Sequence, residues 1–114
     1  MMNIQQYELW LADLNPQFGT EPGKIRPVVI VQTDLLNKIH PSAIVCPVTT
    51  NVQPNSDILR IHLKKGESNV IADCDIMVDQ IRAIDNKRLI KRTGKLSPKK
   101  IALLNENLKI ILDL

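Results

Sequence analysis

The chain has 114 residues, the size of a single domain, which leaves no room for a second catalytic domain or a repeat array. Hydrophobic residues make up 44% of it and charged residues 24%, proportions that exclude a disordered tail and favour a globular protein. The net charge of +3 is unevenly distributed, because residues 60–100 hold 11 Lys or Arg against 5 Asp or Glu. A positive region of this kind points toward a polyanionic partner such as nucleic acid.

The sequence contains no segment that resembles a membrane span or a secretory signal. No apolar run approaches the roughly 20 residues of a membrane-spanning helix. The segment from Met1 to Glu8 lacks the basic start and apolar core of a signal peptide, so we expect a cytoplasmic protein. Cys46 and Cys74 have no CxxC spacing and no nearby histidine at ligand spacing, so we expect packed, reduced thiols and no zinc site, with a disulfide or a reactive thiol as the alternatives.

The first part of the chain predicts two strands separated by a long loop. Residues 7–14 alternate between two faces, as a strand does. Residues 15–24 collect Asn, Pro and Gly and predict a loop of a length that is usually functional or mobile in so small a domain. The apolar run over residues 27–31 predicts a strand buried on both faces. Arg26 precedes Pro27, which forces it into an extended conformation at the entrance to this strand.

The middle of the chain predicts several more short strands. Residues 34–38 favour a helical turn, and residues 43–49 favour a strand in which Pro47 indicates an edge or a bulge. Further strands are expected over residues 58–63, 75–84 and 89–93.

A helix is expected at the C-terminus. Ser97 fits the N-cap position and Pro98 the first helical residue. The chain holds only one Phe, one Trp and one Tyr, so its core must be built from Ile, Leu and Val, which favours sheet. We therefore predict a mainly β fold with a C-terminal helix, in a small and strongly bent barrel. The apolar face of the helix repeats at 3, 4 and 3 spacing, through Ile101, Leu104, Leu108 and Ile111.

Three segments, in the same order as in a known protein family, carry polar residues at the ends of the predicted strands. They are Gly19-Thr20-Glu21-Pro22-Gly23-Lys24-Ile25-Arg26-Pro27-Val28-Val29-Ile30-Val31, then Pro47-Val48-Thr49-Thr50, then Asp79-Gln80-Ile81-Arg82-Ala83-Ile84-Asp85 followed by Arg88-Leu89. These segments closely resemble the signature of the MazF/PemK family of toxin endoribonucleases, and the resemblance runs from about Tyr7 to Leu112. It implies an SH3-like small barrel of the MazF/PemK/CcdB type, formed by residues 1–114 as a single domain.

The resemblance also implies a function. It points to the toxin of a type II toxin-antitoxin system, a sequence-specific and metal-independent endoribonuclease that cleaves single-stranded RNA, either mRNA or rRNA. The products would carry 2′,3′-cyclic phosphate and 5′-hydroxyl ends. Such a protein needs no cofactor, forms a homodimer, does not associate with membranes and is inhibited by a cognate antitoxin. Base choice would depend on the loops at residues 15–24 and 51–57.

Carried over residue by residue, the family's catalytic arginine falls on Arg26 and its catalytic threonine on Thr49. Attack of an RNA 2′-hydroxyl on the adjacent phosphorus builds negative charge on the phosphoryl oxygens. A guanidinium suits that charge because it stays protonated and offers a planar fork of donors. The Thr49 hydroxyl would donate to a phosphoryl oxygen or orient the attacking group. The structural alternatives are an Arg26 that pairs with a carboxylate and a Thr49 that is an ordinary strand residue.

Other members of the family use a His in the first loop and an Arg in the third segment. Thr20 and Met77 occupy those positions here, so that scheme is not assumed. The general base stays open between Glu21 and Asp79. The alternatives are a simple loop charge at Glu21 and a structural hydrogen-bond network around Asp79. The possible catalytic or supporting residues are Glu21, Asp79, Gln80 and Arg82, and the residues expected to bind RNA are Phe18, Gly19, Thr20, Lys24 and Thr50.

Several other polar residues match no segment of the family signature. His40 and His62 are expected to be solvated or packed. Asp73 and Asp75 lie near Asp79 in the sequence, but their spacing fits no calcium loop. We therefore expect no metal site.

Two rival functions remain open at the level of sequence. One is a toxin of the same architecture that binds DNA gyrase without catalysis, for which Arg26 and Thr49 would have no purpose. The other is a non-catalytic RNA-binding module that keeps a positive groove. The few aromatic residues argue against base-stacking platforms, so phosphate contacts and loop hydrogen bonds would provide RNA recognition.

Overall fold

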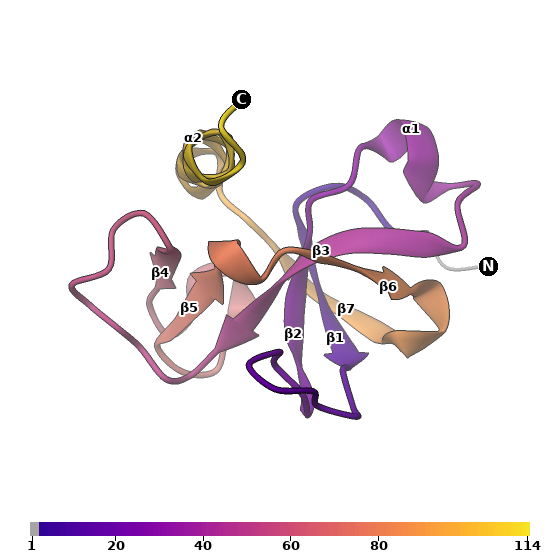
Figure 1. Cartoon of the computed structure of the whole chain (residues 1–114), viewed down its shortest axis with the longest axis horizontal. Helices are drawn as coiled ribbons and strands as arrows, with labels where there is room; N and C mark the ends of the chain where they lie inside the picture. The colour runs from indigo at the N-terminus through magenta and orange to yellow at the C-terminus, as the bar shows by residue number, and fades with distance from the viewer. Residues whose placement is uncertain (1–2) are drawn as a thin grey trace.

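The computed structural model describes residues 3–114, so Met1 and Met2, at the start of the segment examined for a signal peptide, lie outside the described residues. The described residues form a seven-stranded sheet and two α-helices (Figure 1). The strands are β1 (Glu8–Asp13), β2 (Ile25–Ile30), β3 (Ser42–Thr49), β4 (Arg60–Leu63), β5 (Cys74–Met77), β6 (Arg82–Asp85) and β7 (Leu89–Lys95), and the helices are α1 (Asp34–Asn37) and α2 (Pro98–Leu112).

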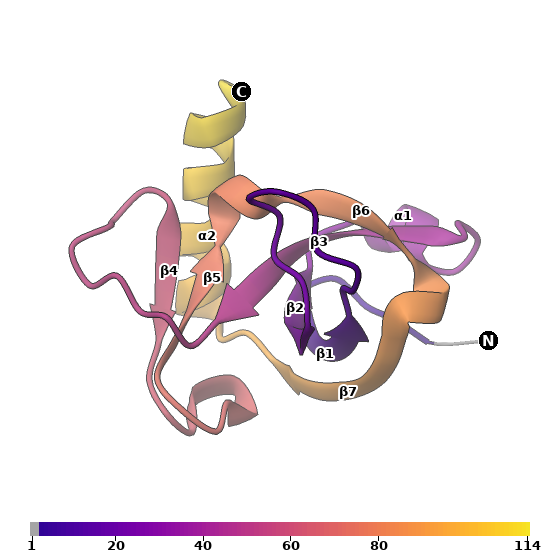
Figure 2. The same cartoon turned by 60° about the horizontal axis from the view of Figure 1, so that its bottom comes forward.

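The sheet is antiparallel and strongly bent. Its strand order is β4-β5-β3-β2-β1-β7, and β6 pairs separately with β3. Helix α2 stands beside β4 and β5, away from β1 and β7 (Figure 2). The mainly β fold with a C-terminal helix is therefore confirmed. Within residues 3–114, no helix is long and apolar enough to cross a membrane.

Of the two alternatives for Pro47, an edge or a bulge, the edge is wrong, because β3 has neighbours on both sides. One side pairs with β2, including the Val28–Pro47 pair. On the other side, residues 42–45 pair with β6, and Val48 and Thr49 pair with β5. Pro47 lies in the gap between these two partners. A residue without an N–H is tolerated there because no ladder bond on that side requires one.

The single strand expected over residues 75–84 is also wrong. The short 3₁₀ helix η2 (Val78–Gln80) divides it into β5 and β6. The chain must cross from one half of β3 to the other, and η2 spans the unpaired stretch around Pro47. The strand expected from residue 58 begins only at Arg60, because the two residues before it are exposed.

The core consists of two clusters on opposite faces of the bent sheet. One gathers around Leu9 and Val29, and the other around Trp10 and Val28. Neighbours along β1 and β2 therefore point into different clusters, which confirms that the apolar run in β2 is buried on both faces. Leu104 anchors α2 to the first cluster. At the start of α2, the Ser97 side chain accepts a hydrogen bond from the Lys100 N–H, as expected of the N-cap.

Candidate functional site

The ends of β2 and β3 bring Arg26 and Thr49 to the same face of the sheet. The two strands pair in the register Val28–Pro47 and Val29–Cys46. Continuing this register toward the strand ends sets Arg26 opposite Thr49. Opposed residues of an antiparallel pair present their side chains on one face, with Cβ atoms about 4.5–5.5 Å apart. Strand pairing, rather than loop conformation, thus brings these side chains together.

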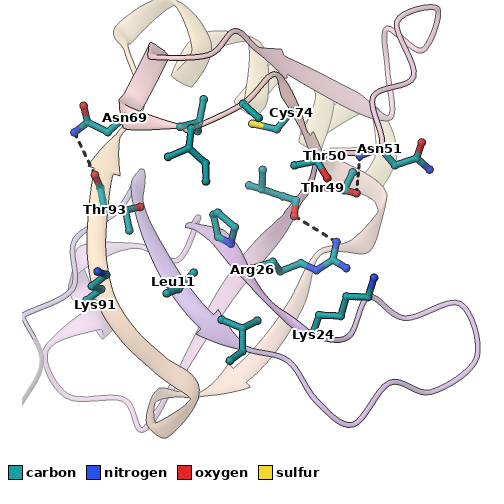
Figure 3. Close-up of a pocket in the computed structure, with 16 residues that line it drawn as sticks. Leu11, Lys24, Arg26, Thr49, Thr50, Asn51, Asn69, Cys74, Lys91 and Thr93 are labelled. Carbon is teal, nitrogen blue, oxygen red and sulfur yellow. Dashed lines mark hydrogen bonds between the residues drawn. The ribbon is translucent and has the colours of Figure 1, made fainter.

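The Arg26 guanidinium is held by backbone carbonyls rather than by a carboxylate. Its Nε donates to the Gly23 oxygen at 2.8 Å, and its Nη1 lies 3.4 Å from the Val48 oxygen (Figure 3). Partial burial lowers the pKa of Arg26, and the group still stays protonated at neutral pH. Among the described residues no ion pair involves this side chain, so the alternative of a structural carboxylate pair at Arg26 is wrong. The remaining guanidinium donors are available to an incoming anion.

Thr49 is half-buried at the end of β3. Its hydroxyl oxygen accepts a hydrogen bond from the Asn51 N–H at 3.1 Å. The hydroxyl proton is not used by that bond and is free to be donated to a ligand. Thr50, which follows, is exposed.

A cavity of about 610 Å³ contains both side chains. Figure 3 shows Lys24, Arg26, Thr49 and Thr50 on one side of it, with Asn69, Lys91 and Thr93 on the other. Within the described part of the chain, three cationic side chains line it and no carboxylate does. A concave site with only positive charge attracts an anion. The lining residues are Leu11, Lys24, Ile25, Arg26, Pro27, Val48, Thr49, Thr50, Asn51, Asn69, Val70, Ile71, Ala72, Cys74, Lys91 and Thr93.

The wall opposite Arg26 depends on a close approach between backbones. Residues 69–72 form part of this wall. The Asn69 side chain donates to the Thr93 oxygen on β7 at 3.2 Å. A Cβ on residue 94 would lie 2.0 Å from the Ser68 oxygen, so only glycine, here Gly94, permits this approach.

The sequence did not predict the residues that form the wall of the cavity opposite Arg26. Lys91 was one of many lysines in a basic region, and nothing in its neighbourhood distinguished it. Asn69 and Thr93 carried no signal, because the cavity forms only when β7 and the segment after β4 come together in space. Alternation along β7 was the available clue, since Lys91 and Thr93 are two residues apart and on the same face.

The expected RNA-binding residues divide into two groups. Lys24 and Thr50 line the cavity. Phe18, Gly19 and Thr20 are exposed on the loop between β1 and β2 and do not line it. Phe18 leaves 68% of its surface exposed. These loop residues stay predicted contacts for RNA that extends beyond the cavity.

The expected supporting residues also lie outside the cavity lining. Glu21 is exposed on the β1–β2 loop, and Asp79 is exposed in η2. Gln80 and Arg82 are half-buried on the same segment. The charge of Asp79 acts on Cys46, since burial and then this carboxylate raise the pKa of that thiol to about 12. Neither candidate base is therefore among the residues that line the cavity.

The two cysteines are the remaining reactive side chains near the site. Both cysteines are free and buried, as expected. Cys74 contacts the cavity, but burial, followed by neighbouring carboxylates that include Asp75, raises the pKa of its thiol to about 11. It is thus a neutral packing group at physiological pH. Across residues 3–114, no cluster of three or more His, Cys, Asp or Glu side chains could hold a metal ion.

The chain matches a known protein family and several solved structures. Residues 5–112 match the sequence model of a family described as PemK-like, MazF-like toxin of type II toxin-antitoxin system. The chain is 36% identical over 111 residues to "Endoribonuclease MazF" of Staphylococcus saprophyticus, covering 97% of this chain and 92% of that protein. The structure of MazF from Deinococcus radiodurans superposes with a TM-score of 0.83 at 20% identity, covering 97% of both chains. A MazE-MazF structure from the same organism gives 0.80 at 18% identity, covering 100% of this chain and 99% of that one.

Proposed function

We propose that this chain, which belongs to the family of PemK-like, MazF-like toxins of type II toxin-antitoxin systems, is an endoribonuclease that cleaves single-stranded RNA by internal attack of a 2′-hydroxyl. The observation that carries the proposal is the cavity that contains both Arg26 and Thr49. Three cations line this cavity, and among residues 3–114 no carboxylate does. The relative named an endoribonuclease, matched over nearly the whole chain, supports the same activity.

In the proposed reaction the scissile phosphate sits between Arg26 and Thr49. The 2′-oxygen attacks the phosphorus, the bond to the 5′-oxygen breaks, and the products are a 2′,3′-cyclic phosphate and a 5′-hydroxyl. The 2′-hydroxyl gives its proton to solvent water and the leaving 5′-oxygen takes a proton from water, so no net proton is consumed. The Arg26 donors not bound to Gly23 and Val48 stabilise the charge that develops on the phosphoryl oxygens. Thr49 donates its hydroxyl proton to one of these oxygens.

Charge stabilisation contributes most of the catalysis in this scheme. Removing one preorganised donor to a developing oxyanion typically costs about 3–4 kcal/mol. Glu21 and Asp79 are both outside the cavity lining, so we propose that neither is the general base. Glu21→Gln and Asp79→Asn should each lower kcat less than about tenfold, below the usual range of effects for acid–base groups.

The proposed partners follow from the same surface. RNA occupies the cavity as the substrate. A cognate antitoxin blocks the cavity, as the solved MazE-MazF structure suggests. A positive surface of this kind fits an acidic inhibitor segment. We propose a homodimer, a reaction that needs no metal or cofactor, and action in the cytoplasm, where mRNA is found.

Cleavage of RNA by the purified chain tests the proposal. A single-stranded RNA is incubated with the protein and a metal chelator, and the fragment ends are mapped. We expect cyclic phosphate and 5′-hydroxyl ends, and a loss of at least about 100-fold in kcat for Arg26→Ala. Lys38→Ala, an exposed cation at the end of α1, is the matched control and should retain full activity.

Two results would contradict the proposal. RNA that stays intact at high protein concentration would favour a toxin that acts by binding another protein. RNA that is bound but not cut would favour a non-catalytic RNA-binding module. Equal activity of Arg26→Ala and Lys38→Ala would show that the cavity is not the catalytic site.

A further inference from the structure

A buried carboxylate lies next to the cavity and takes no part in the proposed chemistry. Asp75 on β5 is fully buried. It pairs in register with Thr49 of β3 on one side and with His62 of β4 on the other. Opposed residues on neighbouring antiparallel strands share one face of the sheet. One row across the sheet therefore connects Thr49 to the Asp75 carboxylate.

The side chains of Arg60 and His62 and one backbone N–H bind this carboxylate. Asp75 Oδ2 accepts from the Gln53 N–H at 2.8 Å and from Arg60 Nη1 at 3.2 Å. Asp75 Oδ1 lies 2.6 Å from His62 Nδ1, and His62 Nε2 lies 3.0 Å from the Ser56 oxygen. The His62 ring therefore bridges the Asp75 carboxylate and the Ser56 backbone oxygen of the β3–β4 connection. Asp75 thus binds the Arg60 guanidinium, the His62 ring and one backbone N–H.

The same cluster holds the β3–β4 loop, residues 50–59, which contains no helix or strand. Arg60 Nη1 donates to the Asn51 oxygen at 3.1 Å, and Asn51 N–H donates to the Thr49 hydroxyl. Asn107 on α2 donates to the Asp57 oxygen at 3.0 Å. The backbone of the loop is therefore tied down at four residues by side chains from β4, β5 and α2. These four are Asn51, Gln53, Ser56 and Asp57.

This loop begins inside the cavity, because Thr50 and Asn51 line it. We propose that Asp75 is a positioning residue: by binding Arg60 and His62 it orders the β3–β4 loop, and the loop orients Thr49 and Thr50 against the RNA. Without the carboxylate, the Arg60 guanidinium would lose its buried anion, and His62 Nδ1 and the Gln53 N–H would lose their hydrogen-bond partner. The loop would then lose its fixed conformation while Arg26, held by Gly23 and Val48, would stay in place. The inference rests on the proposed ribonuclease function.

The main test is Asp75→Asn, which keeps the shape of the side chain and removes its charge. Cleavage sites in a complex RNA pool are mapped by fragment-end sequencing for the variant and for the native protein. We expect the cleaved sequences to become less selective and kcat/KM to fall about tenfold or more, in line with the loss of a charge-assisted bond. Amide hydrogen exchange at Gln53 should accelerate by about tenfold or more for the same reason.

Two further variants keep the test decisive. Ile84→Ala removes a buried side chain in the other core cluster and serves as the control for a simple loss of stability. Should Asp75→Asn not fold, His62→Gln replaces it, because His62 is partly exposed and an amide can donate to only one of its two acceptors at a time. The proposal is overturned if the variant loses thermal stability like Ile84→Ala but keeps the native selectivity and the native exchange rate at Gln53.

The exchange measurement also separates this inference from the proposed function. If the native protein does not cleave RNA, the proposed function fails. Slow exchange at Gln53 that accelerates in Asp75→Asn would still support the ordering of the β3–β4 loop, and unchanged exchange would overturn it.

Discussion

Replacing Gly94 by alanine should destabilise the protein, which reverses the usual effect of this change in a strand. Gly→Ala at a compatible position commonly stabilises by about 0.4–1 kcal/mol, since it restricts the unfolded chain. Here the new Cβ would lie 2.0 Å from the Ser68 oxygen and 2.9 Å from the Ser68 carbonyl carbon. Both are backbone atoms, so no side-chain rotation relieves the clash. The segment around Ser68 must move by about 1 Å or more, at the roughly 1–3 kcal/mol cost of overpacking.

Movement of that segment would also reach the cavity. Ser68 immediately precedes residues 69–72, which line the wall opposite Arg26. We therefore expect Gly94→Ala to lose about 1–3 kcal/mol in urea unfolding and to raise KM for RNA, with kcat much less affected because Arg26 and Thr49 are on other strands.

Gly19→Ala provides the comparison for the Gly94 experiment. Gly19 has φ of +52°, and a Cβ added there would have no atom within 4 Å, so alanine at this position incurs backbone strain without a steric clash. Gly94→Ala that is neutral or stabilising, or that leaves KM for RNA unchanged, would refute the reasoning.

Three further predictions concern a charge, a helix cap and a thiol. Lys91→Ala should weaken RNA binding and reduce the slope of log affinity against log salt by about 0.7, the value for one lost contact to a single strand. Binding titrations at several salt concentrations measure this slope. An unchanged slope would show that RNA does not contact the cavity wall that contains Lys91. Ser97→Ala should lower the free energy of unfolding by about 1 kcal/mol, because it removes the bond to the Lys100 N–H. Cys74 should resist iodoacetamide at pH 7.5 and react only as pH approaches about 11, since its pKa is raised from 9.0 to about 11. The unfolded chain loses this proton first, so unfolding should become easier as pH rises through that interval.

Local features of the sequence were enough to predict most of the elements. The alternation in residues 7–14, the apolar run before Gln32 and the cap at Ser97 each depend on neighbours within a few positions. The backbone conformations that these segments favour locally are therefore also the ones they adopt in the fold. The segments that resemble the MazF/PemK family placed Arg26 and Thr49 in one site, and the β2–β3 register is the physical reason that these side chains converge.

Other features depend on partners that are distant in the chain. Pro47 indicates a break in pairing, but only the sheet decides that the break lies between two partners of a central strand, β5 and β6. The same change of partner inserts η2 into what the sequence predicts as one strand. Periodicity describes which face a residue takes, and it contains no information on which strand will lie beside it.

The sequence alone thus determined most of the secondary elements and the mainly β class, and the family resemblance predicted that Arg26 and Thr49 share a site. The tertiary structure decided which residues form the wall opposite Arg26 and which side chains Asp75 contacts. Lys91 and Asn69 are separated by 22 positions yet line one cavity, and His62 meets the Asp75 carboxylate only because β4 pairs with β5. Charges and hydrogen bonds act through space over a few ångströms, so their effects follow from packing and not from order along the chain.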